Sequence, residues 1–192
     1  QIALKFGGTI DKYIGDALMI FFGDPESEGP EKDAKKCVEM ALEMQNLMDE
    51  LRGHWGKHYS LKKDLQIRIG INTGFCTVGN FGSFDRIDYT AIGSTVNLAS
   101  RLEGLAGPGS ILISEDTHSL VNGFFNFKKS KEVEVKGFLR KIKCFELDQV
   151  DRSKDDALHI NGKGFEIKIN RKLIDQRTIE ELKLELDQLK KV

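Results

Sequence analysis

The stretch DRIDYTAIGSTVNLASRLEGLAGPGSILIS, residues 85–114, contains a strand, a helix and a second strand in close succession. Residues 85–92 mix β-branched and aromatic side chains with polar ones, which favours a strand. Ser94 is of a residue type that caps helices, and we predict it as the N-cap of a helix over 95–106. Residues 110–114 predict the next strand. The interleaving of strands and helices favours an α/β or α+β sandwich over a helical bundle.

The segments upstream continue the mixed pattern. Residues 65–74 alternate apolar and polar side chains, which is typical of a half-buried strand. Residues 30–55 carry apolar side chains at three- and four-residue steps and predict an amphipathic helix. Further upstream, two strands over 9–14 and 17–22 are separated by Gly15-Asp16, a pair suited to a hairpin turn. The second of these strands is apolar on both faces, so we predict a buried central strand.

The segments downstream complete one domain. A short helix over 114–121 is predicted to be capped by Ser114, and residues 124–147 predict two or three strands. Residues 151–158 are polar and predict a linker. We therefore expect one domain over residues 1–150.

An extension follows over residues 151–192. An alternating pattern over 159–169 predicts a strand or hairpin. Apolar residues over 176–192 recur at helical steps and predict an amphipathic helix with a narrow apolar seam, which could dock on its own domain or pair with a second copy.

Composition excludes several classes of function. The 192 residues carry 29 Lys+Arg and 30 Asp+Glu, so no dominant basic surface exists for a nucleic acid polymer or an anionic membrane. No apolar run approaches the roughly 20 residues that span a bilayer. The three cysteines lack a C-x-x-C pair, which argues against a thiolate zinc site and favours a reducing cytoplasm. His54 and His58 share a helical spacing but lack the surrounding carboxylate motif of a zinc site.

Four side chains have both a structural and a chemical interpretation. Asp16 suits a turn, and a carboxylate fixed there could also hold a divalent cation. Lys12, four residues earlier, is either a solvated strand lysine or a donor to a ligand at the same place. Asn97 and Arg101 lie four residues apart on one helix, and they form either a solvated polar face or a pair that grips a sugar and a phosphate.

Three blocks of sequence resemble one known family. They are KYIGDALMIFFG (12–23), RIGINTG (68–74) and YTAIGSTVNLASRLEG (89–104). In this order and at these separations they resemble the catalytic domain of class III nucleotidyl cyclases, bacterial adenylyl cyclases in particular, over residues 1 to about 150. The resemblance implies an α+β fold, an α/β sandwich of ferredoxin-like or palm-like type whose mixed, largely antiparallel central sheet is flanked by helices.

The resemblance also implies a reaction. Family members convert a nucleoside triphosphate to a 3′,5′-cyclic monophosphate and pyrophosphate, as dimers with the active site at the shared interface. Two divalent cations, Mg²⁺ or Mn²⁺, are held by two aspartates, and Asp16 matches the second of these. The ions would neutralise the triphosphate and help to ionise the 3′-hydroxyl. The chain is therefore expected to bind ATP as a homodimer.

Five further positions match family roles. Lys12 and Thr90 match the residues that read the base: adenine N1 accepts from a lysine and the N6 amino group donates to a threonine oxygen, whereas guanine presents a donor at N1. This pairing favours ATP. Asn97 matches the asparagine that orients the ribose, and Arg101 the arginine that stabilises charge on the α-phosphate. Lys136 matches, more weakly, a lysine that meets the terminal phosphates.

One departure leaves alternatives open. The family's first metal-binding aspartate lies in an upstream strand motif that these residues do not contain, which we interpret as an N-terminally incomplete piece of a cyclase. A non-catalytic nucleotide-binding or dimerisation module is the alternative, and a guanylyl cyclase is another. A diguanylate cyclase is disfavoured because no G-G-D-E-F run occurs. The domain itself is expected in the cytoplasm, and the sequence leaves open whether the full-length protein is tethered to a membrane.

Overall fold

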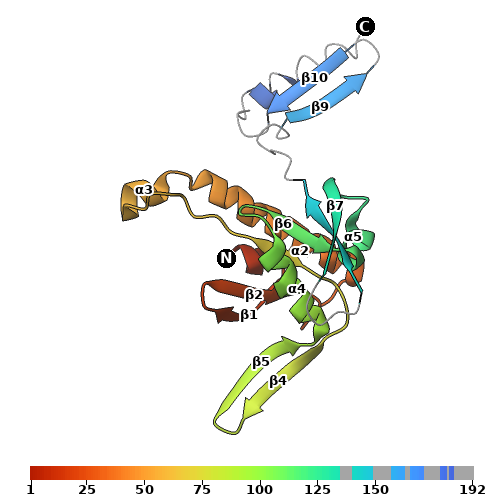
Figure 1. Ribbon diagram of the computed structural model, residues 1–192. Coiled ribbons are helices and arrows are strands. Elements are labelled where there is room, and N and C mark those ends of the chain that lie inside the picture. The colour runs from red at the N-terminus through yellow and green to blue at the C-terminus, as the bar shows by residue number, and fades with distance from the viewer. Residues whose placement is uncertain (135–139, 149–156, 163–164, 171–177, 181, 184–192) are drawn as a thin grey trace. The chain divides into compact units, whose positions relative to one another are not determined.

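The computed structural model describes residues 1–134, 140–148, 157–162, 165–170, 178–180 and 182–183 (Figure 1). The chain forms two compact units, Gln1–Asp148 and Gln149–Val192.

A four-stranded mixed sheet lies at the centre of the first unit. Its strands are β3 (Ile69–Ile71), β6 (Ile111–Ser114), β8 (Ile142–Leu147) and β7 (Phe127–Val133), in that spatial order. β3 and β6 are parallel, whereas β8 is antiparallel to both β6 and β7. The predicted α+β fold with a mixed sheet flanked by helices is therefore confirmed.

Helices cover both faces of this sheet (Figure 1). α2 (Pro30–Glu50) and α5 (Glu115–Val121) pack on one face, and α4 (Ser94–Leu105) packs on the other. β6 is buried on both sides because its side chains alternate between two cores. The core beneath α2 and α5 contains Val38, Ala41, Ile111, Ile113, Val121 and Leu147. The core beneath α4 contains Leu98, Leu102, Leu112, Ile142 and Cys144.

Two hairpins lie outside the central sheet. The first follows α1 (Ile2–Lys5) and pairs β1 (Thr9–Ile14) with β2 (Ala17–Phe21) around the predicted Gly15-Asp16 turn. The second pairs β4 (Thr77–Ser83) with β5 (Arg86–Ile92) and projects away from α4 (Figure 1).

The prediction of a buried central strand over 17–22 is wrong. Among the described residues β2 pairs only with β1, and its side chains are half-buried or exposed. A short apolar run in the sequence shows that a strand is hydrophobic, but it does not show which part of the protein packs against that strand. An apolar face that is exposed in the single chain is typical of an interaction surface.

Element boundaries differ from the predictions in other places. The helix predicted over 30–55 ends at Glu50, and a separate helix, α3 (His54–Tyr59), follows it. The strand predicted over 65–74 is reduced to β3. β4 was not predicted, because glycines interrupt its pattern.

The two predicted N-caps have different outcomes. Ser94 is the first residue of α4, and Gly93 occupies the N-cap position without a side-chain hydrogen bond, so that prediction is wrong. The N-cap predicted at Ser114 is confirmed, because its hydroxyl accepts a hydrogen bond from the backbone N–H of Thr117 at 3.2 Å.

Gly70 brings α4 close to the sheet. A Cβ atom at this position would lie 2.2 Å from the backbone nitrogen of Glu103 and 2.3 Å from the carbonyl oxygen of Ala99. Both atoms belong to the backbone of α4, so no side-chain rotation could relieve the overlap. The missing side chain at Gly70 therefore fixes the position of α4, the helix that carries Asn97 and Arg101.

We expect Gly70→Ala to lower the free energy of unfolding by about 1–3 kcal/mol or more, as overpacking does. Gly104→Ala is the matched control, because a Cβ there meets nothing within 4 Å and an alanine favours the helix by up to about 1 kcal/mol. Urea unfolding of both variants is the measurement. Equal stability of Gly70→Ala and the wild type would contradict the close approach.

The second unit contains one described hairpin. β9 (Ala157–Gly162) pairs antiparallel with β10 (Phe165–Asn170). Most of the predicted linker over 151–158 and most of the predicted helix over 176–192 lie outside the described residues. No helix within the described ranges is long and apolar enough to cross a bilayer.

Candidate active site

A β-bulge in β1 shapes the candidate site. The pairing of β1 with β2 shifts by one residue between Ile10 and Lys12, which leaves Asp11 as the extra residue. In a regular strand neighbouring side chains point to opposite faces, whereas a bulge re-aims the side chains around it. At this bulge the Asp11 side chain contacts both β5 and the neighbouring residue Lys12.

Asp11 joins the first hairpin to β5. One carboxylate oxygen, Oδ2, accepts a hydrogen bond from the hydroxyl of Thr90 at 2.7 Å and another from the backbone N–H of Ala91 at 2.9 Å. The Asp11 side chain is fully buried, and Thr90 is 3% exposed. A second contact of the Thr90 hydroxyl, with the carbonyl oxygen of Ala91, is longer at 3.4 Å.

The same carboxylate faces Lys12. The ammonium nitrogen of Lys12 lies 3.4 Å from the other oxygen, Oδ1, which is buried and makes no hydrogen bond. The Lys12 side chain is 40% exposed, so its ammonium remains accessible to a ligand. The structure thus brings Lys12 and Thr90 together on either side of one carboxylate. Sequence reasoning missed Asp11, although an acidic residue among strand formers directly before Lys12 was a usable signal.

Tyr89 provides a second connection between the hairpin and β5. Its hydroxyl donates a hydrogen bond to the Asp24 carboxylate, and its ring centroid lies 6.5 Å from that of Phe21. The hydrogen bond to Asp24 is the main cause of a raised pKa for Tyr89. Together with Asp11 these contacts fix the edge of the hairpin against β5.

Asn97 and Arg101 lie one turn apart on α4 and are both exposed. Neither side chain makes a hydrogen bond or ion pair with another described residue, so both are available to a ligand. The helix beneath them is anchored. Asn72 donates to the carbonyl oxygen of Thr95 at 3.0 Å, and Arg68 pairs with Glu103 at 2.9 Å.

Asp16 lies in the turn between β1 and β2. Gly15 adopts a φ of +65° there, a conformation that glycine enters without strain. Asp16 is exposed, and its carboxylate has no partner among the described residues. Within those residues no three His, Cys, Asp or Glu side chains gather to hold a metal ion. Mg²⁺ commonly binds one or two carboxylates together with substrate phosphates, so a lone accessible carboxylate fits this cation when a triphosphate supplies further ligands.

The remaining predicted residue, Lys136, lies outside the described residues. Within one chain no contact joins Asp16 to Asn97 or Arg101 across the described segments. The structure therefore groups Lys12 with Thr90 and Asn97 with Arg101, and leaves Asp16 apart.

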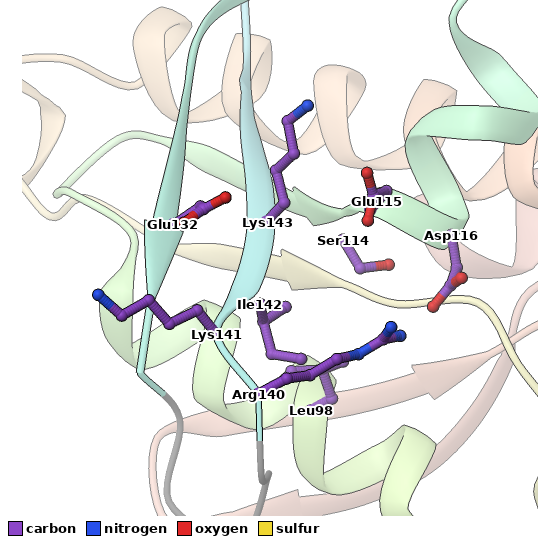
Figure 2. Close-up of a pocket in the computed structure, with 9 residues that line it drawn as sticks. All are labelled: Leu98, Ser114, Glu115, Asp116, Glu132, Arg140, Lys141, Ile142 and Lys143. Atoms are coloured by element: carbon purple, nitrogen blue, oxygen red, sulfur yellow. The ribbon is translucent and has the colours of Figure 1, made fainter.

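A pocket of about 320 Å³ lies elsewhere in the first unit (Figure 2). It contains none of the predicted site residues. Figure 2 shows Arg140 extending beneath Asp116 while Lys141 points the opposite way. The lining residues are Leu98, Ser114, Glu115, Asp116, Glu132, Arg140, Lys141, Ile142 and Lys143. The pocket is lined by both acidic and basic side chains, so its charge does not indicate a particular class of ligand.

Comparisons with known proteins point to one family. Residues 9–149 match the family model described as the adenylate and guanylate cyclase catalytic domain. The crystal structure of the adenylyl cyclase CyaB from P. aeruginosa is similar at 44% identity and a TM-score of 0.73, over 85% of this chain and 76% of that one.

Curated relatives include cyclases of both specificities. An adenylate cyclase of Anabaena cylindrica is 38% identical over 146 residues, which are 73% of this chain and 28% of that protein. The receptor-type guanylate cyclase gcy-13 of Caenorhabditis elegans is 37% identical over 127 residues, 65% of this chain and 12% of that protein. The chain thus spans less than a third of either relative.

Proposed function

Because the chain belongs to the adenylate and guanylate cyclase catalytic-domain family, we propose that it converts ATP to 3′,5′-cyclic AMP and pyrophosphate. The observation that carries the choice of ATP is the arrangement of Lys12 and Thr90 around Asp11. A lysine donor beside a threonine oxygen complements the N1 acceptor and N6 donor of adenine. Guanine presents a donor at N1 and an acceptor at O6, so both contacts would be lost.

We assign the remaining roles from the family resemblance, which the exposure of Asn97 and Arg101 supports. Asn97 holds the ribose so that its 3′-oxygen faces the α-phosphorus. This oxygen releases its proton to solvent and forms a bond to the α-phosphorus. The bond between the α-phosphorus and the oxygen that bridges it to the β-phosphate breaks, and pyrophosphate leaves with that oxygen. Arg101 donates to the α-phosphate oxygens, on which negative charge accumulates in the transition state. For Lys136, which lies outside the described residues, the family resemblance alone assigns contact with the terminal phosphates.

The family generally uses two divalent metal ions. In this chain Asp16 would hold Mg²⁺ or Mn²⁺ through its accessible carboxylate. The bound cation supplies charge neutralisation for the triphosphate and makes the 3′-hydroxyl easier to ionise.

Cyclase domains act as dimers, and we propose a homodimer here. Exposed aromatic and aliphatic side chains gather on the two hairpins, which is typical of an interaction surface. They include Tyr13, Ile14 and Leu18 on the first hairpin, and Phe84, Ile87, Tyr89 and Ile92 on the second. In this dimer Asp16 of one subunit serves a site whose Lys12, Thr90, Asn97 and Arg101 come from the other. Each dimer then has two equivalent sites.

We propose a reducing compartment, the cytoplasm, for this domain because its three cysteines are few and scattered in the sequence. All three are free, and burial raises the pKa of Cys37 to about 12. A thiol so reluctant to ionise is a poor partner for disulfide exchange.

The choice of base is tested by exchanging the two residues that read it. The full-length protein with Mn²⁺ is expected to form cyclic AMP from ATP and little cyclic GMP from GTP. Lys12→Glu combined with Thr90→Cys is expected to shift this preference toward GTP, because a glutamate accepts from guanine N1. Chromatography of the products measures both. An unchanged preference in the double variant, or cyclic GMP as the main wild-type product, would overturn the assignment.

A further inference from the structure

We propose that Asp11 is a positioning residue that selects adenine by setting the hydrogen-bonding polarity of Thr90 and the location of the Lys12 ammonium. This inference rests on the proposed function of Lys12 and Thr90 as the residues that read the base. Asp11 itself is not proposed to touch the nucleotide, because its two carboxylate oxygens already face Thr90, Ala91 and Lys12.

Asp11 sets the direction in which the Thr90 hydroxyl donates. Oδ2 of Asp11 accepts from the backbone N–H of Ala91, a group that can only donate, and Oδ1 faces the Lys12 ammonium. With both Asp11 oxygens facing donors, the Thr90 hydroxyl is the donor in its hydrogen bond to Oδ2. The 2.7 Å contact with Oδ2 is shorter than the competing 3.4 Å contact with the Ala91 carbonyl oxygen.

This direction fixes what Thr90 can offer a ligand. A hydroxyl has one proton and two lone pairs. With its proton held by Asp11, the Thr90 oxygen can only accept, which suits the N6 amino group of adenine and repels the O6 acceptor of guanine. Without Asp11 the hydroxyl could rotate and donate to guanine, so threonine alone would discriminate poorly between the two bases.

The same carboxylate also holds the Lys12 ammonium. A buried carboxylate oxygen without a hydrogen bond is costly, and here the Lys12 ammonium is the charge that compensates Oδ1. The bulge in β1 allows this contact between adjacent residues. The long lysine side chain is thereby held beside Thr90 rather than free in solvent, although it stays 40% exposed toward a ligand.

The test uses Asp11→Asn, which preserves the shape of the side chain. The amide oxygen must take the Oδ2 position to accept from Ala91, so the amide N–H₂ group then faces the Lys12 ammonium and repels it. We expect the ratio of kcat/KM for ATP over GTP to fall by about tenfold or more, the effect of losing one charged hydrogen bond, mainly through a higher KM for ATP. Asp88→Asn is the matched control, an exposed aspartate of β5 whose change should leave the ratio intact.

Two further measurements separate positioning from a structural role. In a Lys12→Ala background Asp11→Asn is expected to change the ratio much less, because residues that act through one another are not additive. Thr90→Val, which removes only the hydroxyl, is expected to lower the same ratio even if Asp11→Asn does not fold. Equal losses for ATP and GTP in Asp11→Asn, or an unchanged ratio in Thr90→Val, would overturn the proposal.

Binding of 3′-deoxy-ATP and 3′-deoxy-GTP, which cannot cyclise, distinguishes this proposal from the proposed function. If the wild type makes no cyclic nucleotide but prefers 3′-deoxy-ATP, and Asp11→Asn lowers that preference, the cyclase assignment fails and the role of Asp11 holds. If the wild type makes cyclic AMP and Asp11→Asn keeps the full preference in binding, the role of Asp11 fails and the cyclase assignment holds.

Discussion

Replacing Arg101 by alanine is expected to lower kcat by about 10²–10³, the usual cost of removing a group that stabilises transition-state charge. The effect should fall on kcat more than on KM, because the α-phosphate gains charge only as the 3′-oxygen attacks. Stability should not change, because the side chain is exposed and makes no hydrogen bond or ion pair with any other described residue.

The matched control for Arg101→Ala is Arg52→Ala. Arg52 is also an exposed arginine, paired with Asp49 at 2.7 Å on the surface. The control should retain full activity, since exposed pairs of this kind contribute about 0–1 kcal/mol to stability and none to the site. Steady-state kinetics and thermal melting of both variants are the measurements. An Arg101→Ala enzyme with normal kcat would remove Arg101 from the reaction.

Asp16→Ala is expected to reduce activity at least as strongly, and to make the remainder respond weakly to added Mg²⁺ or Mn²⁺. The carboxylate is exposed and has no partner among the described residues, so its removal should leave the melting temperature unchanged. Titration of activity with each metal is the measurement. Asp116→Ala, which changes an aspartate of the separate pocket, is the control and should leave the metal response unchanged. Full activity of Asp16→Ala at low metal concentration would contradict a metal role for this residue.

The fold could be predicted from the sequence wherever periodicity and burial coincide. β6 was placed correctly, and its apolar residues alternate between the two cores. α4 was placed correctly because its apolar residues follow one face of the helix. β2 was misplaced because its residues are as hydrophobic as those of a core strand. In the single chain these residues are half-buried or exposed. β4 was missed because its glycines hide a pattern that only pairing with β5 reveals.

The candidate site was predicted in part. Lys12, Asp16, Thr90, Asn97 and Arg101 were recognised by resemblance, since no local pattern separates them from ordinary surface polarity. The contact between β1 and β5 could not be predicted, because Asp11 and Thr90 are separated by 79 residues. A β-bulge leaves no mark in the sequence, so neither the burial of Asp11 nor its approach to Lys12 was foreseen.

The most direct test of the shared site mixes two inactive variants. Asp16→Ala and Arg101→Ala chains of the full-length protein, unfolded and refolded together in equal amounts, are expected to recover about a quarter of wild-type activity, because about half of randomly paired dimers are mixed and each has one intact site. Arg101→Ala mixed with Asn97→Ala is the control and should recover none, because those residues serve the site from the same subunit. Recovery of cyclic AMP synthesis only in the first mixture is the predicted result. No recovery in the first mixture, or equal recovery in both, would contradict a site divided between two subunits.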